Sequence, residues 1–277
     1  MGKRKLLLSV VLVMLLAGIA NAANVGSIWK FVNETRPLVI AHRGASSLAP
    51  ENTLAAVQVA LELEVDVVEI DVHRSFDGQL VVLHDKTVNR TTSGKGSVTD
   101  LTLEELKQLD AGSWFKSSFK GETIPTLREV LKATKDKAIL LIELKGERTE
   151  VRTVELVKEL GMEDQVVIQS FDFQQIQKVK QRAPEIPTVW LVREPKHSED
   201  PQKAANWIAN TTEYVGATGI GIRHNWFTPE LMATAKERNL AIFVWTVDSR
   251  ADMKSFIKAG VHGIITNRPQ NLLLLLP

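Results

Sequence analysis

Short apolar runs rich in β-branched residues recur along the chain, and segments with helical apolar periodicity separate most of them. Strands that alternate with amphipathic helices are typical of a parallel sheet covered by helices, the α/β class. The expected strands are Leu38–Ala41, Val65–Val72, Leu80–Leu83, Ala138–Leu144, Val166–Gln169, Pro187–Val192, Gly219–Ile222, Ala241–Thr246 and Gly263–Thr266. The expected helices are Thr53–Glu64, Leu127–Lys135, Thr149–Leu160, Phe173–Arg182, Pro229–Asn239 and Arg250–Ala259.

Nine strand runs are one more than an eight-stranded barrel contains. The second and third runs leave no room for a crossover helix between them, and Asp77-Gly78 is a strong hairpin turn signal. We therefore interpret the third run as an antiparallel return of the second. A two-residue turn would set Asp71 opposite His84. The other eight runs predict a (β/α)8 TIM barrel.

Residues 86–123 interrupt the alternation of strands and helices. This stretch contains one short helical pattern and three aromatic residues, Trp114, Phe115 and Phe119. We expect a small capping insertion between the third strand and the following helix, over the face of the barrel where active sites lie. The expected domain is thus a single barrel over residues 23–277.

The first 22 residues have the three parts of a secretory signal peptide. Three positive charges at Lys3–Lys5 precede the apolar run Leu6–Ala20, and Ala20-Asn21-Ala22 has the small-x-small pattern of a cleavage site. Cleavage would leave a mature chain that is exported, periplasmic or secreted, with no stable membrane insertion. An uncleaved anchor is the alternative, although the apolar run is short for a ~30 Å bilayer core.

Composition narrows the function classes. The hydrophobic share of 44% and the charged share of 24% are ordinary for a folded globular protein. Lys+Arg 34 against Asp+Glu 33 gives a net charge of +1, so no basic character points to a nucleic-acid partner. The absence of cysteine excludes disulfides, thiolate zinc sites and a cysteine nucleophile.

Polar side chains cluster at the carboxyl ends of the expected strands, the end at which barrel enzymes perform chemistry. Three of them are carboxylates, Glu69, Asp71 and Glu143. Carboxylates placed together repel one another unless a cation lies between them, and oxygen ligands favour a hard ion. We therefore expect one divalent cation, Mg²⁺ or Ca²⁺, as cofactor.

The remaining strand-end residues suit a phosphate ester. The guanidinium of Arg43 matches phosphate oxygens and Lys145 adds a point charge. His42 and His84 have no serine or cysteine partner in a recognisable motif, which favours proton transfer over acyl-enzyme chemistry. Together with the metal, these groups indicate hydrolysis of a phosphate ester.

The stretches AHRGASSLAPENT, VVEIDVHRSFDGQLVVLHD, LDAGSWF, GETIPTLREVL, IELK, WTV and GIITNRP resemble the glycerophosphodiester phosphodiesterase family, which shares its barrel with phosphatidylinositol-specific phospholipases C. The resemblance implies metal-dependent hydrolysis of a small-molecule glycerophosphodiester to sn-glycerol 3-phosphate and an alcohol. It implies that His42 and His84 form the acid–base pair. The other roles it implies are metal ligation by Glu69, Asp71 and Glu143, phosphate binding by Arg43 and Lys145, and pocket walls at Gln169, Phe171 and Trp245.

Several alternatives stay open at this stage. A lysophospholipase D would use the same site with a longer apolar groove, and a non-catalytic barrel could bind a phosphate ligand. Either the glycerol hydroxyl or a water could attack first. The resemblance also has departures, because His262 and Asn267 stand where the family pattern has aspartates. We expect Asn52 to support a ligand or cap a helix, and His84 to be the acid with His42 the base.

Overall fold

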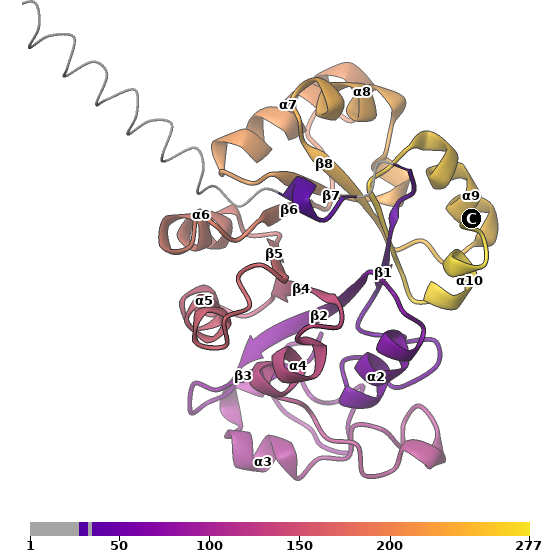
Figure 1. Ribbon diagram of the computed structural model, residues 1–277. Helices are drawn as coiled ribbons and strands as arrows, with labels where there is room; N and C mark the ends of the chain where they lie inside the picture. Colours follow the sequence, from indigo (N-terminus) through magenta and orange to yellow (C-terminus); the bar gives the residue numbers. More distant parts are fainter. Residues whose placement is uncertain (1–27, 33–34) are drawn as a thin grey trace, which may run out of the picture.

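The computed structural model describes residues 28–32 and 35–277, and the expected signal peptide lies outside them. Within these residues, eight parallel strands form a closed ring, because β1 pairs with both β2 and β9. Figure 1 shows the helices outside this ring. The strands are β1 (Leu38–Ala41), β2 (Val67–Arg74), β3 (Leu80–Val82), β4 (Ile139–Leu144), β5 (Val166–Ser170), β6 (Thr188–Val192), β7 (Gly219–Arg223), β8 (Ala241–Trp245) and β9 (Gly263–Thr266).

The predicted (β/α)8 TIM barrel is thereby confirmed, with β3 as the antiparallel return beside β2. In the described part of the chain, no helix is both long and apolar enough to cross a bilayer. The helices are α2 (Leu54–Glu62), α3 (Leu103–Lys107), α4 (Leu127–Thr134), α5 (Glu150–Glu159), α6 (Phe173–Arg182), α7 (Pro201–Tyr214), α8 (Pro229–Glu237), α9 (Arg250–Ala259) and α10 (Pro269–Leu273).

Helix α7 is one element that the apolar pattern does not predict. Its buried face consists mainly of small or polar side chains such as Ala205, Ala209 and Thr212, with Ile208 as the one large apolar residue among them. The start signal is present nevertheless, because Asp200 caps the helix and Pro201 follows at the first position.

The predicted pairing of Asp71 with His84 is wrong by one residue. Strands β2 and β3 pair Val72 with Val82, and the Leu83 backbone N–H donates to the Asp71 carbonyl oxygen at 3.0 Å. Leu83 therefore takes the position opposite Asp71, and His84 follows as the first residue beyond it.

The turn explains the shifted register. The Ser75 backbone N–H donates to the Gln79 carbonyl at 2.9 Å, which leaves three residues in the loop instead of two. Gly78 has φ of +81°, as expected at the last position of a three-residue hairpin loop. Asp77 is held by Ser75 Oγ at 2.6 Å and by the Leu103 backbone N–H at 3.0 Å, so the α3 segment fixes the turn.

Apolar side chains fill the barrel interior and leave one end for polar groups. Side chains of Ile40, Leu141 and Phe243 pack inside the ring, while a larger cluster lies between the strands and the helices. Between β3 and α4, the segment 86–123 has its own cluster around Leu106. It also contains η2 (Val98–Asp100), α3 and η3 (Ser117–Phe119), and α3 lies beyond β3 in Figure 1.

Candidate active site

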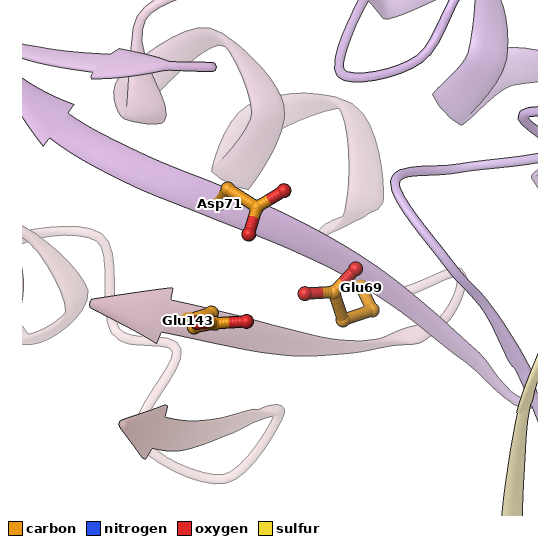
Figure 2. Close-up of side chains that lie close together, drawn as sticks. All are labelled: Glu69, Asp71 and Glu143. Atoms are coloured by element: carbon orange, nitrogen blue, oxygen red, sulfur yellow. The ribbon is translucent and has the colours of Figure 1, made fainter. Parts of the chain in front are cut away.

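Strand geometry brings the predicted residues to one end of the barrel. His42 and Arg43 follow β1 directly, while Glu69 and Asp71 lie two apart on β2 and so face the same side. The register of β2 with β4 pairs Asp71 with Glu143. As a result, carboxylate oxygens of Glu69, Asp71 and Glu143 lie within 4.8 Å of one another. Figure 2 shows the three side chains close together on β2 and β4.

The electrostatics of these three carboxylates reflect their crowding. Burial, together with the charges of Asp71 and Glu143, raises the pKa of Glu69 well above its usual range. Burial and the charge of Asp71 raise the pKa of Glu143 to about 7. Burial alone would also raise the pKa of Asp71, but the nearby cations of Arg43 and Lys145 hold it below its ordinary value.

The donor set fits a hard divalent cation. Asp71 Oδ1 and Glu143 Oε1 are buried, and the Lys145 ammonium lies 3.5 and 2.8 Å from them. Buried carboxylates are costly unless cations compensate them, and Lys145 with Arg43 supplies two positive charges against the three negative charges of Glu69, Asp71 and Glu143. Since all three side chains offer oxygen, the site matches the preference of Mg²⁺ and Ca²⁺.

Arg43 is anchored by an unusual backbone. It has φ of +58°, which turns its backbone N–H towards Glu69 Oε2 at 2.9 Å, and its guanidinium donates to Glu51 Oε1 at 2.7 Å. Gly44 follows with φ of +76°, and a Cβ atom there would lie 2.6 Å from the Ala56 carbonyl carbon. The His-Arg-Gly sequence therefore needs its glycine for close packing on α2.

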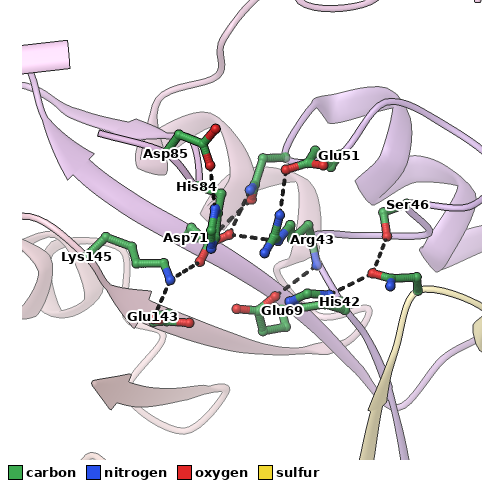
Figure 3. Close-up of polar contacts among 12 residues, drawn as sticks. His42, Arg43, Ser46, Glu51, Glu69, Asp71, His84, Asp85, Glu143 and Lys145 are labelled. Carbon is green, nitrogen blue, oxygen red and sulfur yellow. Dashed lines mark hydrogen bonds and ion pairs between the residues drawn. The ribbon is translucent and has the colours of Figure 1, made fainter. Parts of the chain in front are cut away.

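Asp71 is fixed on both sides, as the dashed lines of Figure 3 indicate. Asn52 Nδ2 donates to Asp71 Oδ2 at 2.8 Å, and Asn52 Oδ1 accepts the Asp71 backbone N–H at 3.2 Å. Lys145 Nζ lies 3.5 Å from Asp71 Oδ1. Asn52 thus supports a carboxylate, while Thr53 is the residue that caps α2.

His42 is oriented by a chain of polar contacts. Its Nδ1 lies 2.7 Å from Asn267 Oδ1, Ser46 Oγ donates to the same oxygen, and Asn267 Nδ2 donates to Asp248 Oδ2 at 2.7 Å. Because Asn267 presents its amide oxygen, Nδ1 carries the proton and Nε2 is left as an acceptor. Burial and the neighbouring charge of Arg43 lower the pKa of His42 to about 4.

His84 has a carboxylate partner. Its Nδ1 donates to Asp85 Oδ1 at 2.7 Å, and Arg90 Nε holds the other Asp85 oxygen at 2.8 Å. Burial lowers the pKa of His84, but the negative charge of Asp71 and the bond to Asp85 partly offset that effect. His73, which is buried, lies with Nε2 3.1 Å from the His84 carbonyl oxygen and fixes the main chain there.

A cavity of about 250 Å³ opens at this end of the barrel. Asp71 is fully buried and does not line the cavity. Phe171 and Trp245 form an edge-to-face pair with ring centroids 5.5 Å apart. The structure brings nine of the ten predicted residues to the cavity lining, namely His42, Arg43, Glu69, His84, Glu143, Lys145, Gln169, Phe171 and Trp245.

Other polar residues of the site are not predicted from the sequence. Arg90, from the segment 86–123, donates hydrogen bonds to both Asp85 and Glu51. Among the described residues, no residue of this segment lines the cavity itself. Arg193 and Arg223 line the cavity, and the Arg193 guanidinium lies over the Phe171 ring. The sequence feature that could have identified them is their position at the carboxyl ends of successive strands. Arg193 directly follows β6, and Arg223 is the last residue of β7.

Comparison with known proteins agrees with this geometry. The model of the glycerophosphoryl diester phosphodiesterase family matches residues 42–271. A glycerophosphodiester phosphodiesterase from Caldanaerobacter subterraneus subsp. tengcongensis is 41% identical over 250 residues, covering 86% of this chain and 97% of that protein. One from Bacillus subtilis is 34% identical, with 97% of each chain covered.

Solved structures show the same barrel. A phosphodiesterase from Oleispira antarctica, in complex with the product sn-glycerol-3-phosphate, has a TM-score of 0.81 and 31% identity, with 90% of this chain and 98% of that chain covered. A glycerophosphodiester phosphodiesterase from Agrobacterium tumefaciens has a TM-score of 0.75 and 31% identity, covering 86% and 99% of the two chains. The chain therefore belongs to the glycerophosphoryl diester phosphodiesterase family and is an enzyme of that kind.

Proposed function

We propose that this enzyme hydrolyses glycerophosphodiesters to sn-glycerol 3-phosphate and an alcohol with the help of one divalent cation, Mg²⁺ or Ca²⁺. The observation that carries the proposal is the group of three buried carboxylates, Glu69, Asp71 and Glu143, at a small cavity that two imidazoles also line. When bound there, the cation supplies positive charge to the phosphoryl oxygens and to the attacking oxygen.

In this proposal the two histidines move protons and act as the catalytic pair. His42 is neutral, with Nδ1–H directed at Asn267, so its Nε2 accepts the proton of the attacking hydroxyl or water. His84 has the carboxylate of Asp85 at Nδ1 and the negative charge of Asp71 nearby, and both stabilise the imidazolium against the effect of burial, so His84 donates a proton to the leaving alkoxide oxygen.

Arg43 and Lys145 bind the phosphate in the same proposal. Both cations lie among the ligand carboxylates, with Arg43 Nε 3.4 Å and Lys145 Nζ 3.5 Å from Asp71. A phosphate held there lies next to the metal ligands. Gln169, whose Nε2 donates to Glu69 at 3.3 Å, fixes that carboxylate, and Phe171 and Trp245 form an apolar wall for the glycerol carbons.

The size of the cavity favours a small substrate over a lysophospholipid. The cavity of about 250 Å³ is small for a ligand pocket, and the hollow of about 500 Å³ that adjoins it is lined mainly by polar and charged residues such as Lys86, Glu147 and Asp172, which do not suit an acyl chain. Trp114, Phe115 and Phe119 do not line the cavity and instead pack edge-to-face on one another, with centroids 5.7 to 5.8 Å apart. The neighbour from Oleispira antarctica binds a product of similarly small size, sn-glycerol-3-phosphate.

A substrate panel tests the proposal. Glycerophosphocholine, glycerophosphoethanolamine and lysophosphatidylcholine are each offered with Mg²⁺, Ca²⁺ or chelator, and release of glycerol 3-phosphate is measured. We expect cleavage of the first two only, and only with metal. Glu143→Gln should lose most of this activity, while Glu237→Gln, an exposed carboxylate at the end of α8, serves as the matched control. Full activity after exhaustive chelation would refute the metal role.

A further inference from the structure

Two arginines lie side by side in the cavity wall away from the carboxylates. Val192 of β6 pairs with Ile222 of β7, so Arg193 and Arg223 occupy the next matching positions on neighbouring parallel strands. Both side chains are exposed and both line the cavity. Two like charges at adjacent strand ends repel each other, and an anion bound between them would remove that repulsion.

Neither guanidinium has an ion-pair or hydrogen-bond partner among residues 28–32 and 35–277. The Arg193 guanidinium instead lies 4.8 Å from the ring centroid of Phe171, which orients it along the cavity wall. The other two cations of the cavity differ in this respect, because Arg43 and Lys145 are each paired with carboxylates.

The position of the pair separates it from the scissile phosphate of the proposed reaction. Glu69 and Asp71 lie on β2 and Glu143 on β4, whereas the order of the sheet places β5 between β4 and β6, with β7 beyond. Arg193 also borders an adjoining hollow of about 500 Å³ that begins at His84, Glu143 and Lys145 and reaches Lys86. In the order of the closed ring, β6 and β7 lie across from β1 and β2, so Arg193 and Arg223 face a bound substrate from the side opposite His42, Arg43 and Glu69.

We infer that Arg193 and Arg223 form a subsite for a second anionic group, a phosphate on the alcohol portion of the glycerophosphodiester. The guanidinium fork matches phosphate oxygens and donates hydrogen bonds to two of them at once. The inference rests on the proposed function and adds a charge preference to it, because a cationic alcohol such as choline would meet two positive charges at this position.

The experiment compares three substrates that differ in the charge of the alcohol: glycerophosphocholine, glycerophosphoglycerol, and glycerophosphoglycerol with a terminal phosphate. We expect the wild type to have the highest kcat/KM on the third. The double variant Arg193→Gln/Arg223→Gln should lose about 10- to 100-fold on that substrate, as expected for hydrogen bonds to a charged group. It should change by less than about threefold on glycerophosphoglycerol.

Arg182→Gln, an exposed arginine at the end of α6, is the matched control. An equal loss on all three substrates would mean that the arginines hold the scissile phosphate, and it would overturn the inference while leaving the proposed function intact. An unchanged substrate preference in the double variant would overturn it as well. If the wild type cleaves none of the three, the proposed function fails and the subsite falls with it.

Discussion

Replacing Glu143 by Gln should have opposite effects on stability and on metal binding. In the metal-free protein, Glu143 is a buried carboxylate close to Glu69 and Asp71, and burial together with Asp71 raises its pKa from 4.5 to about 7. Ionised Glu143 therefore destabilises the fold when no cation is present. Glutamine keeps the shape of the side chain and removes this charge.

The magnitude follows from the two pKa values. The folded protein keeps the Glu143 proton up to about pH 7, whereas the unfolded chain releases it near pH 4.5. Protonation of this group therefore contributes its full stability below pH 4.5, and that contribution is lost as the pH rises to about 7. At about 1.4 kcal/mol per pH unit, the loss is on the order of 3 kcal/mol. Glu143→Gln should thus stabilise the metal-free protein by up to that amount at pH 8, and by little at pH 4.5.

The assay is denaturant unfolding in chelator at pH 4.5 and pH 8, repeated with Mg²⁺ or Ca²⁺ at pH 8. The cation should stabilise the wild type more than Glu143→Gln, because a ligand that binds only the folded state adds stability in proportion to its affinity. Glu237→Gln should behave as the wild type in all conditions. A variant less stable than the wild type in chelator at pH 8 would refute the idea that the three carboxylates repel one another.

Other changes test separate parts of the structure. His84→Ala should lose about 10²- to 10⁴-fold in kcat/KM on glycerophosphocholine. It should lose far less on a p-nitrophenyl phosphodiester, because that leaving group needs no proton. A similar loss on both substrates would exclude His84 as the acid. Asn267→Asp adds a negative charge next to His42 and should move the acid limb of kcat/KM to higher pH, and an unmoved limb would contradict the role of His42 as base. Leu106→Ala should destabilise the segment 86–123 by about 2–5 kcal/mol, measured by denaturant unfolding and local hydrogen exchange; unchanged exchange would count against a packed insertion. Exported protein should begin at Ala23 by intact mass, whereas full-length protein retained in the membrane would contradict cleavage.

The barrel is largely predictable from sequence because its strands are buried on both faces. Runs such as Val166–Gln169 and Gly263–Thr266 carry this buried pattern and reappear as β5 and β9. Helix α7 is missed although Asp200 and Pro201 mark its start, because its buried face carries small and polar residues and only one large apolar side chain, Ile208. The hairpin register is missed because Ser75 and Gln79 pair across a three-residue loop, a choice that depends on a contact of Asp77 with the distant Leu103.

The site is predictable where its residues lie at the carboxyl ends of the barrel strands. Glu69 and Glu143 belong to different strands, yet both end at the same face of the barrel, so residue type and strand position suffice to group them. Asp248 and Arg90 come from loops, and their roles depend on side-chain contacts with Asn267 and Asp85 that no periodicity encodes.

The central claim is that three carboxylates hold one hard cation at the mouth of the barrel. A crystal structure with Mn²⁺ or Ca²⁺, in which anomalous scattering locates the ion, tests this claim most directly. We predict a single ion within about 2.0–2.6 Å of oxygens from Glu69, Asp71 and Glu143. The absence of an ion between these three residues at saturating metal, or its binding elsewhere in the barrel, would contradict the account.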